Sequence, residues 1–398
     1  MFRIKKIFLL LFISLLLYAN SFSQTLGLKG QLSSWLTLNV DRISESQAGI
    51  RYLPTVFFEK PISNDLSFDA EVSLNAYGTG QFHGFFDDFE TDGKIKPYRI
   101  WGRFATNQFE ARIGLQKINF GSATLLRPLM WFDRIDPRDP LQITDGVYGL
   151  LLRYYFLNNA NLWLWGLYGN DEIKGWEFVP SDYKSLEYGG RFQYPVPKGE
   201  LAVSYHHRRI DLEKGLINVL SLAGISTIES PSTAGILDLD ITSEDRFGLD
   251  GRWDITVGLW LEGVLIHQDI DFFPLKYQRL INVGIDYTFG LGNGIHALYE
   301  HFLFEISETA FGEGEGFEFS ALSLNYPLGL LDNLTGMVYY DWENEDWYRF
   351  LNWQRTYDSW SFYLMAFWNP DQFQIYQNLQ GNNLFAGKGF QFMVVLNH

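Results

Sequence analysis

The strongest constraint on the fold of this chain is an alternation of apolar and polar residues that recurs from about residue 26 to the last residue. In the segment that begins at Leu66, residues 66, 68, 70, 72 and 74 are apolar and the residues between them are polar. A β-strand has a side-chain period of two, so such a segment forms a strand with one apolar and one polar face. The sequence therefore predicts an all-β protein built from many strands of this kind.

The first 23 residues have the pattern of a secretory signal peptide. Arg3, Lys5 and Lys6 precede an apolar stretch over residues 7–18, and small residues precede the expected cleavage before Gln24. The apolar stretch is much shorter than the roughly 20 residues that a membrane-spanning helix needs. We expect residues 1–23 to be removed and residues 24–398 to form one domain.

Composition narrows the class of protein further. The chain has no cysteine, which excludes a disulfide framework, and its net charge of -16 argues against a nucleic-acid partner. Aromatic residues make up 17% of the chain, as belts of Trp and Tyr at membrane interfaces require. We therefore predict a single closed antiparallel transmembrane β-barrel in the outer membrane of a Gram-negative-type bacterium, surrounded by lipid and lipopolysaccharide. A soluble all-β protein is the alternative.

The connections between strands predict the strand number and orientation. The pattern favours about 18 strands, with 16 as the alternative, and the connections largely alternate between short and long. Bacterial barrels have short periplasmic turns, long extracellular loops and periplasmic termini. The expected strand starts are residues 26, 49, 66, 97, 109, 143, 160, 186, 201, 246, 257, 279, 295, 317, 334, 348, 361 and 387. The expected long extracellular loops are residues 77–96, 121–141, 170–185, 210–245 and 369–383.

The parity of each strand assigns the residues that face the lumen. The inward arginines come from the first ten or so strands: Arg51, Arg99, Arg103, Arg112, Arg153, Arg191, Arg208, Arg246 and Arg252. The inward charges of the later strands are acidic: Glu262, Asp286, Glu300 and Asp341. We expect these residues to line a pore with a cationic wall opposite an anionic wall, which would orient hydrated solutes. The alternative is that the charges pair with neighbours such as Glu110, Glu187, Asp250 and Asp254 in a plugged interior, because buried arginines need partners.

A long loop from Gly121 to Asp145 is the second informative element. Its aromatic residues, prolines and balanced charges argue for order, and loops of this length are usually functional or disordered. If the loop folds into the barrel mouth, it forms a constriction; the alternative is a cap over the rim. The candidate constriction residues are Arg127, Trp131, Asp133, Arg134, Asp136 and Arg138.

The same region resembles a pattern in known outer-membrane channels. Residues 112–121 read Arg-Ile-Gly-Leu-Gln-Lys-Ile-Asn-Phe-Gly, and Arg127, residues 131–133 and residues 136–137 follow. In porin-like and alginate-export-like barrels, a strand reading roughly Arg-x-Gly-x-Gln leads into a long loop that begins with glycine. The resemblance implies a channel, and by analogy with export of an acidic polysaccharide it implies that Arg99, Arg103, Arg112 and Arg153 contact the solute.

The sequence shows no set of residues that predicts a cofactor, a metal ion or an active site. His206 and His207 are adjacent on a strand, so their rings point to opposite faces and cannot share a metal. An acidic cluster in an expected loop, Asp87, Asp88, Glu90 and Asp92, lacks the spacing of a calcium loop. His267 and His301 have outward parity, as in barrel-embedded lipases, but the sequence assigns no serine partner to either.

Three functions remain open at this point. The leading hypothesis is an outer-membrane channel for diffusion or weakly selective transport of small hydrophilic solutes, with anionic or saccharide solutes among the candidates. The second is a non-conducting barrel for surface-polysaccharide assembly or secretion, and the third is a barrel-embedded hydrolase. The expectation is that the protein is not an enzyme; the sequence does not identify the solute or the oligomeric state.

Overall fold

A computed structural model describes residues 25–41, 46–83, 88–216, 241–270, 274–370 and 385–398. The expected signal peptide and Asp87 lie outside the described residues. Among the described residues, no helix is long and apolar enough to span a membrane.

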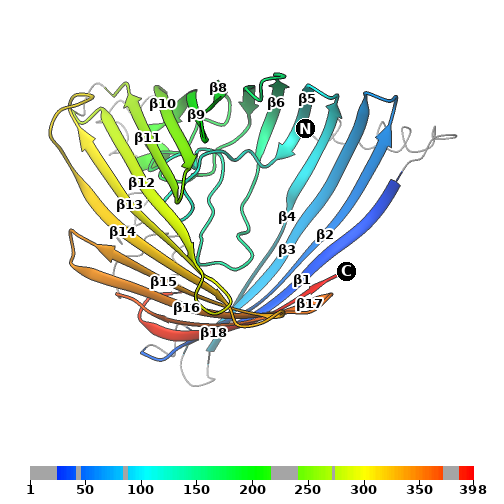
Figure 1. The fold of residues 1–398 in the computed structure, drawn as a ribbon, viewed down its shortest axis with the longest axis vertical. Helices are drawn as coiled ribbons and strands as arrows, with labels where there is room; N and C mark the ends of the chain where they lie inside the picture. The colour runs from blue at the N-terminus through cyan, green and yellow to red at the C-terminus, as the bar shows by residue number, and fades with distance from the viewer. Residues whose placement is uncertain (1–24, 42–45, 84–87, 217–240, 271–273, 371–384) are drawn as a thin grey trace.

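The described residues form one 18-stranded antiparallel sheet that closes on itself (Figure 1). Each strand pairs with the next along the chain, and β1 pairs with β18, for example Gln31 with Asn397 and Asn39 with Gly389. The first strands are β1 (Thr25–Asn39), β2 (Gln47–Pro61), β3 (Ser67–His83), β4 (Asp88–Ala105), β5 (Phe109–Gln116), β6 (Val147–Tyr155), β7 (Asn161–Tyr168), β8 (Leu186–Val196) and β9 (Gly199–Asp211). The remaining strands are β10 (Ile241–Asp254), β11 (Gly258–Gln268), β12 (Tyr277–Phe289), β13 (Ile295–Ser307), β14 (Gly314–Pro327), β15 (Asp332–Asp341), β16 (Asp346–Thr356), β17 (Trp360–Trp368) and β18 (Lys388–Asn397).

The predicted fold class is confirmed, with 18 strands and not 16. The first and last strands also meet at the end of the barrel that carries the short turns, where Gly30 and His398 exchange two backbone hydrogen bonds. One predicted loop is wrong: residues 77–96 are mostly strand, since β3 and β4 remain paired up to His83 and Asp88. Polar residues dominate this hairpin, and a strand pair that extends beyond the membrane needs no apolar face.

The outer surface carries the apolar face that alternation predicted. Leu150, Val283, Ile285 and Leu364 are all exposed there. Exposed aromatic side chains gather at both ends of the strands, near the short turns (Phe104, Phe109, Tyr154, Tyr194, Tyr287, Phe289 and Trp360) and near the long connections (Tyr148, Tyr168, Tyr188, Trp342, Trp347 and Trp368). A closed barrel of even strand number with an apolar outer band and aromatic girdles is a fold of the outer-membrane type.

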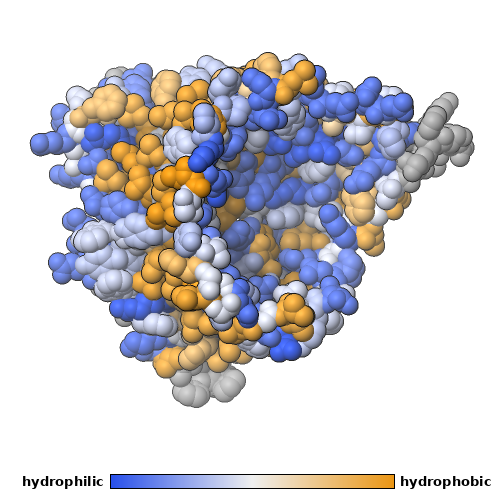
Figure 2. Space-filling model, viewed as in Figure 1, coloured by the Kyte–Doolittle hydropathy of each residue, from blue (hydrophilic) through white to orange (hydrophobic). Residues whose placement is uncertain are grey.

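The longest connection whose residues are all described, residues 117–146 between β5 and β6, does not project from the rim. Figure 1 shows it in teal, crossing the space between β4 on one side and β12 and β13 on the other. Figure 2 shows a recess in the middle of the same view, with hydrophilic residues over much of its right-hand wall. The loop and the walls around it form the candidate site.

Candidate functional site

The loop of residues 117–146 is packed inside the barrel and is not a cap over the rim. Its apolar side chains are almost completely buried; those in the largest apolar cluster are Ile118, Phe120, Ala123, Leu125, Leu126, Leu129, Trp131 and Phe132. They pack against inward residues of the strands, including Leu151 on β6, Trp165 on β7 and Phe302 on β13. The structure therefore places the loop across the lumen, the first of the two positions considered from the sequence.

Two glutamates on the opposite wall bind the backbone of this loop. Glu300 on β13 accepts hydrogen bonds from the amides of Thr124, Leu125 and Leu126, at 2.6, 3.0 and 2.7 Å. Glu262 on β11 accepts one from the amide of Ala123 at 2.7 Å and a shorter one from Ser122. A carboxylate that accepts several backbone N–H groups forms strong, charge-assisted bonds. These two side chains therefore hold the loop across the barrel.

Gly121 allows the loop to begin this close to the wall. Its φ of +97° is in the region that favours glycine, and a Cβ atom there would lie 2.5 Å from Oε1 of Glu262. A side chain at this position would collide with the carboxylate that anchors the next two residues. The presence of glycine at the start of the expected loop therefore has a steric explanation.

A second connection, residues 169–185 between β7 and β8, packs beneath the first. Trp176 stacks on Phe302 and donates its indole N–H to the carbonyl oxygen of Arg127 at 3.0 Å. The amide of Gly175 donates to the carbonyl oxygen of Asp133 at 3.0 Å. The two loops therefore support each other inside the barrel.

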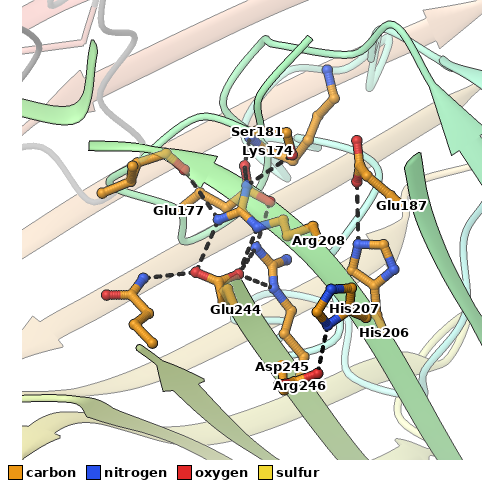
Figure 3. Close-up of polar contacts among 12 residues, drawn as sticks. Lys174, Glu177, Ser181, Glu187, His206, His207, Arg208, Glu244, Asp245 and Arg246 are labelled. Carbon is orange, nitrogen blue, oxygen red and sulfur yellow. Dashed lines mark hydrogen bonds and ion pairs between the residues drawn. The ribbon is translucent and has the colours of Figure 1, made fainter. Parts of the chain in front are cut away.

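The second loop also delivers a carboxylate to a buried ion cluster (Figure 3). Glu244 on β10 lies between Arg208 on β9 and Arg246 on its own strand, with N···O distances of 2.6 Å to each. Glu177 from the loop completes the cluster, at 3.1 Å from Arg208 and 2.7 Å from Arg246. Gln268 donates a further hydrogen bond to Glu244 at 2.6 Å. Arg208, expected to line a pore, is instead fully buried and neutralised.

Arg191 and Arg99 are also buried on the inward face. Arg191 on β8 forms a two-pronged pair with Asp250 on β10, at 2.5 and 2.7 Å, and lies over the ring of Phe120. Arg99 on β4 donates to the carbonyl oxygen of Thr144 at 2.9 Å and stacks on Tyr98. Both arginines therefore support the loop and its surroundings and do not face open solvent.

Three of the predicted arginines remain partly exposed in a cluster that we call the arginine vestibule: Arg103, Arg112 and Arg153, together with Asp69 and Glu110. They lie near the short-turn end of β3 to β6, with side-chain exposures of 31% for Arg103 and 16% each for Arg112 and Arg153. Arg103 pairs with Asp69 at 2.6 Å, while Glu110 lies 3.0 Å from Arg112 and 3.6 Å from Arg103 and Arg153. These five residues carry three guanidinium and two carboxylate charges, and Glu59 and Glu71 share their inward face, opposite Asp69 and Trp101 in register.

The charged residues of the loop are paired largely within the loop itself. Arg127 contacts Asp133 at 3.4 Å, and burial raises the pKa of the Asp133 carboxyl while the charge of Arg127 offsets part of that effect. Arg138 pairs with Asp136 at 2.8 Å and lies over Phe350 of β16. The backbone of Arg134 donates to the hydroxyl of Thr144 at 2.8 Å.

The expected anionic wall is not a free surface. Glu262 and Glu300 are fully buried under the loop, Asp286 lies 3.4 Å from Arg252, and Asp341 accepts the amides of Glu343 and Asn344 in a turn. Glu262, Glu300 and Asp341 are therefore buried and do not form an exposed anionic wall, while Asp286 keeps a side-chain exposure of 19% beside Arg252. Parity identifies the side of the strand correctly, but it does not distinguish a water-filled lumen from one filled by a loop.

The two histidines follow their parity. His206 points inward, where it lies 3.2 Å from Glu187 and accepts a hydrogen bond from the indole N–H of Trp165 at 3.1 Å. His207 points outward to Asp245 at 2.8 Å (Figure 3). Among the described residues, no group of three His, Cys, Asp or Glu residues could hold a metal ion. The acidic loop cluster is described only in part: Glu90 and Asp92 are exposed, and the side chain of Asp88 is not described.

Several residues of the site were not singled out from the sequence. Glu177 is in a loop, Asn282 donates to the carbonyl oxygen of Leu126 at 2.8 Å, and Asp69 and Glu244 neutralise arginines. Strand parity could have placed Asp69, Glu244 and Asn282 inward. No local signal identifies Glu177, because its role depends on where the second loop folds.

Comparison with known proteins gives matches only among solved structures. No model of a protein family matches the sequence, and no curated protein matches it. Structural matches include OmpT, an outer membrane protein of Vibrio cholerae, in its trimer form (TM-score 0.49, 11% identity, 95% of this chain and 99% of that chain). They also include a mutant of the Rh. blastica porin (0.44, 11%, 94% and 100%) and Salmonella typhi OmpF in complex with daunomycin (0.45, 10%, 94% and 97%). At these scores the matches carry no argument, and the fold rests on the strand pairing.

Proposed function

We propose that this protein is an outer-membrane channel for small hydrophilic solutes, with the loop of residues 117–146 as its constriction. The observation that carries the proposal is the arginine vestibule. It leaves charged, solvent-accessible side chains on the inner wall next to a loop that spans the lumen. A lumen built only to be filled has no need of partly exposed arginines, whereas a solute path does.

The vestibule would favour anionic solutes, including acidic saccharides. Its three partly exposed guanidinium groups attract anions, an effect that salt screens over about 10 Å at 0.1 M. Arg112 lies over Trp101 and Arg153 over Trp163, at 4.8 and 3.8 Å from the ring centroids. Guanidinium groups held over aromatic rings are restrained in position and can donate paired hydrogen bonds to a carboxylate or a sugar.

A closed barrel with an assembly role is the second candidate. It is favoured by the apolar cluster that joins the loop to residues from β6 to β17, including Trp260, Phe319 and Met365. An apolar interior excludes water from that part of the lumen, so any path must pass along the polar wall of β2 to β5.

Reversal potentials in planar bilayers test the channel. Arg103→Gln and Arg153→Gln together remove two positive charges from the vestibule, so the reversal potential in a salt gradient should move toward cation selectivity. The shift should be larger at low ionic strength because screening is weaker there. Arg355→Gln is the matched control, since Arg355 lies on the outer face near the same end of the barrel and pairs with Asp332.

Liposome swelling with neutral, acidic and basic sugars then ranks the solutes. We expect acidic sugars to enter faster than basic sugars of equal size in the wild type, and the order to reverse in the double variant. If the folded wild type shows no conductance and still shows none after the loop is released, as described in the Discussion, the barrel is closed and the assembly role replaces the channel.

A further inference from the structure

A serine, a histidine and a glutamate meet on the outer face of the barrel, on strands β13 and β14. Ser320 and His301 are directly opposite each other in register, and the Ser320 hydroxyl lies 3.0 Å from Nδ1 of His301. The other ring nitrogen of His301 lies 3.7 Å from Oε2 of Glu318. The sequence left His301 without a serine partner, and the pairing of β13 with β14 supplies one.

This set lies on the outer face where the apolar band meets the aromatic girdle that includes Trp342 and Trp347. In register, His301 has Val283 on its other side, and the next outward row toward the long loops contains Ile281 and Leu303. The charged pair of Arg279 and Glu305, at 2.7 Å, comes only one outward row further along. A histidine and a carboxylate that face lipid are costly, and such residues are therefore candidates for function.

Two further donors surround the serine oxygen. The indole N–H of Trp342 donates to Oγ of Ser320 at 2.9 Å, and the hydroxyl of Tyr299 lies 3.1 Å from it. His301 and Glu318 keep side-chain exposures of 34% and 50%, so the set is reached from the outer face and not from the lumen. Tyr340 packs against Trp342 and Trp347, which gives one side of the set an aromatic surface.

We propose that Ser320, His301 and Glu318 form a serine hydrolase site that cleaves acyl esters of glycerophospholipids in the surrounding leaflet. A nucleophile within hydrogen-bond reach of a base, with an acid beside that base, is the arrangement that activates serine. The site opens to the lipid face among aliphatic and aromatic side chains, so a substrate with acyl chains reaches it directly. This activity is independent of transport through the lumen.

The reaction needs no group beyond these residues and water. His301 takes the proton of the Ser320 hydroxyl as Oγ forms a bond to the ester carbonyl carbon. The bond between that carbon and the alcohol oxygen then breaks, and His301 returns the proton to the leaving lysophospholipid. Water attacks the acyl-serine and gives a proton to His301; the fatty acid leaves as that proton returns to Oγ.

The side chains of Tyr299 and Trp342 stabilise the negative charge that develops in this reaction. The oxyanion of the tetrahedral intermediate is one carbon atom away from Oγ, so donors that already lie within 3.1 Å of Oγ come within reach of it. The ladder bonds of the sheet occupy the backbone amides of strands, which is why side chains have this task on a barrel wall. Glu318 is a positioning residue that acts through His301.

The test uses the full barrel refolded in detergent, with folding verified by heat-modifiable electrophoretic mobility. A fluorophosphonate probe should label Ser320, identified by peptide mass spectrometry, and mixed micelles of diacyl phosphatidylethanolamine should release fatty acid. Ser320→Ala should abolish the labelling. Both Ser320→Ala and His301→Gln should lower the rate of hydrolysis by roughly a thousandfold or more. Ser243→Ala is the matched control, because Ser243 is an outward serine that faces Arg209 in register and should leave both signals unchanged.

Glu318→Gln separates positioning from a merely structural role. The variant should lower kcat while KM stays close to that of the wild type, because Glu318 acts on the base and does not contact the substrate. The proposal is overturned if labelling persists in Ser320→Ala. It is also overturned if the folded wild type does not react with the probe and releases no more fatty acid than Ser320→Ala. Conductance should be the same in Ser320→Ala and the wild type, so failure of this site leaves the channel proposal standing.

Discussion

Glu300→Gln should release the loop from the opposite wall without unfolding the barrel. The carboxylate accepts three backbone amides, of Thr124, Leu125 and Leu126. The glutamine side chain has one acceptor oxygen in place of two, so its NH2 group faces at least one of these backbone N–H donors. The substitution also removes the negative charge. Hydrogen bonds to charged groups contribute about 1.5–3 kcal/mol each, so we expect the docked loop to lose about 2–4 kcal/mol.

This loss is large enough to measure as a change in population. Since about 1.4 kcal/mol corresponds to a factor of ten, the ratio of docked to released loop should fall by roughly 30-fold to several-hundred-fold. The released loop should no longer narrow the lumen. Single-channel recordings should therefore show a higher conductance level, or frequent transitions to one, and limited proteolysis should cut the loop in the variant sooner than in the wild type.

Asp286→Asn is the matched control for this experiment. Asp286 lies on the neighbouring strand and pairs with Arg252, at 3.4 Å, and not with the loop. It should therefore leave the conductance level and loop proteolysis close to those of the wild type. If Glu300→Gln folds and still shows the wild-type conductance and cleavage rate, the hydrogen bonds of Glu300 do not hold the loop and the reasoning is refuted.

Three further predictions concern the loop, the buried ions and the membrane face. Gly121→Ala should loosen the loop in the same assays, because the new Cβ meets Glu262 at a positive φ; unchanged conductance would contradict this. Asp250→Ala should destabilise the barrel by about 3–5 kcal/mol in urea titrations by leaving Arg191 buried and unpaired, and a loss below 1 kcal/mol would show that the pair is not desolvated. Leu152→Arg should cost roughly 2–4 kcal/mol in refolding into bilayers if the position is near the midplane, and an unchanged folding yield would mean that this face does not meet lipid.

The strands could be predicted from the sequence because their signal is local. A period of two over a single segment, as at Leu66, records that one face meets lipid and the other does not, and turn residues mark where it ends. The one large error, over residues 77–96, arose where that signal stops. Beyond the membrane the β3–β4 hairpin is held by its own backbone pairing. Its strands therefore need no apolar face, and the sequence pattern that marks the other strands is not required there.

The placement of residues on the two faces could also be predicted, but their partners could not. Parity placed Arg191 and Arg208 inside, yet the carboxylates that neutralise them include one from a distant loop, Glu177. On the outer face, parity identified His301, whereas its serine became apparent only when the register of β13 and β14 placed Ser320 opposite it. Register is decided by pairing along whole strands, which no single segment records.

The interior was decided by tertiary structure alone. The aromatic residues, prolines and balanced charges of residues 121–145 predicted an ordered loop. Whether it caps the rim or enters the lumen depends on Glu262 and Glu300, which lie 139 and 176 residues along the chain from the amides they bind. Local pattern determines that a strand has an inward face, while the contacts across the closed barrel determine whether that face meets water or protein.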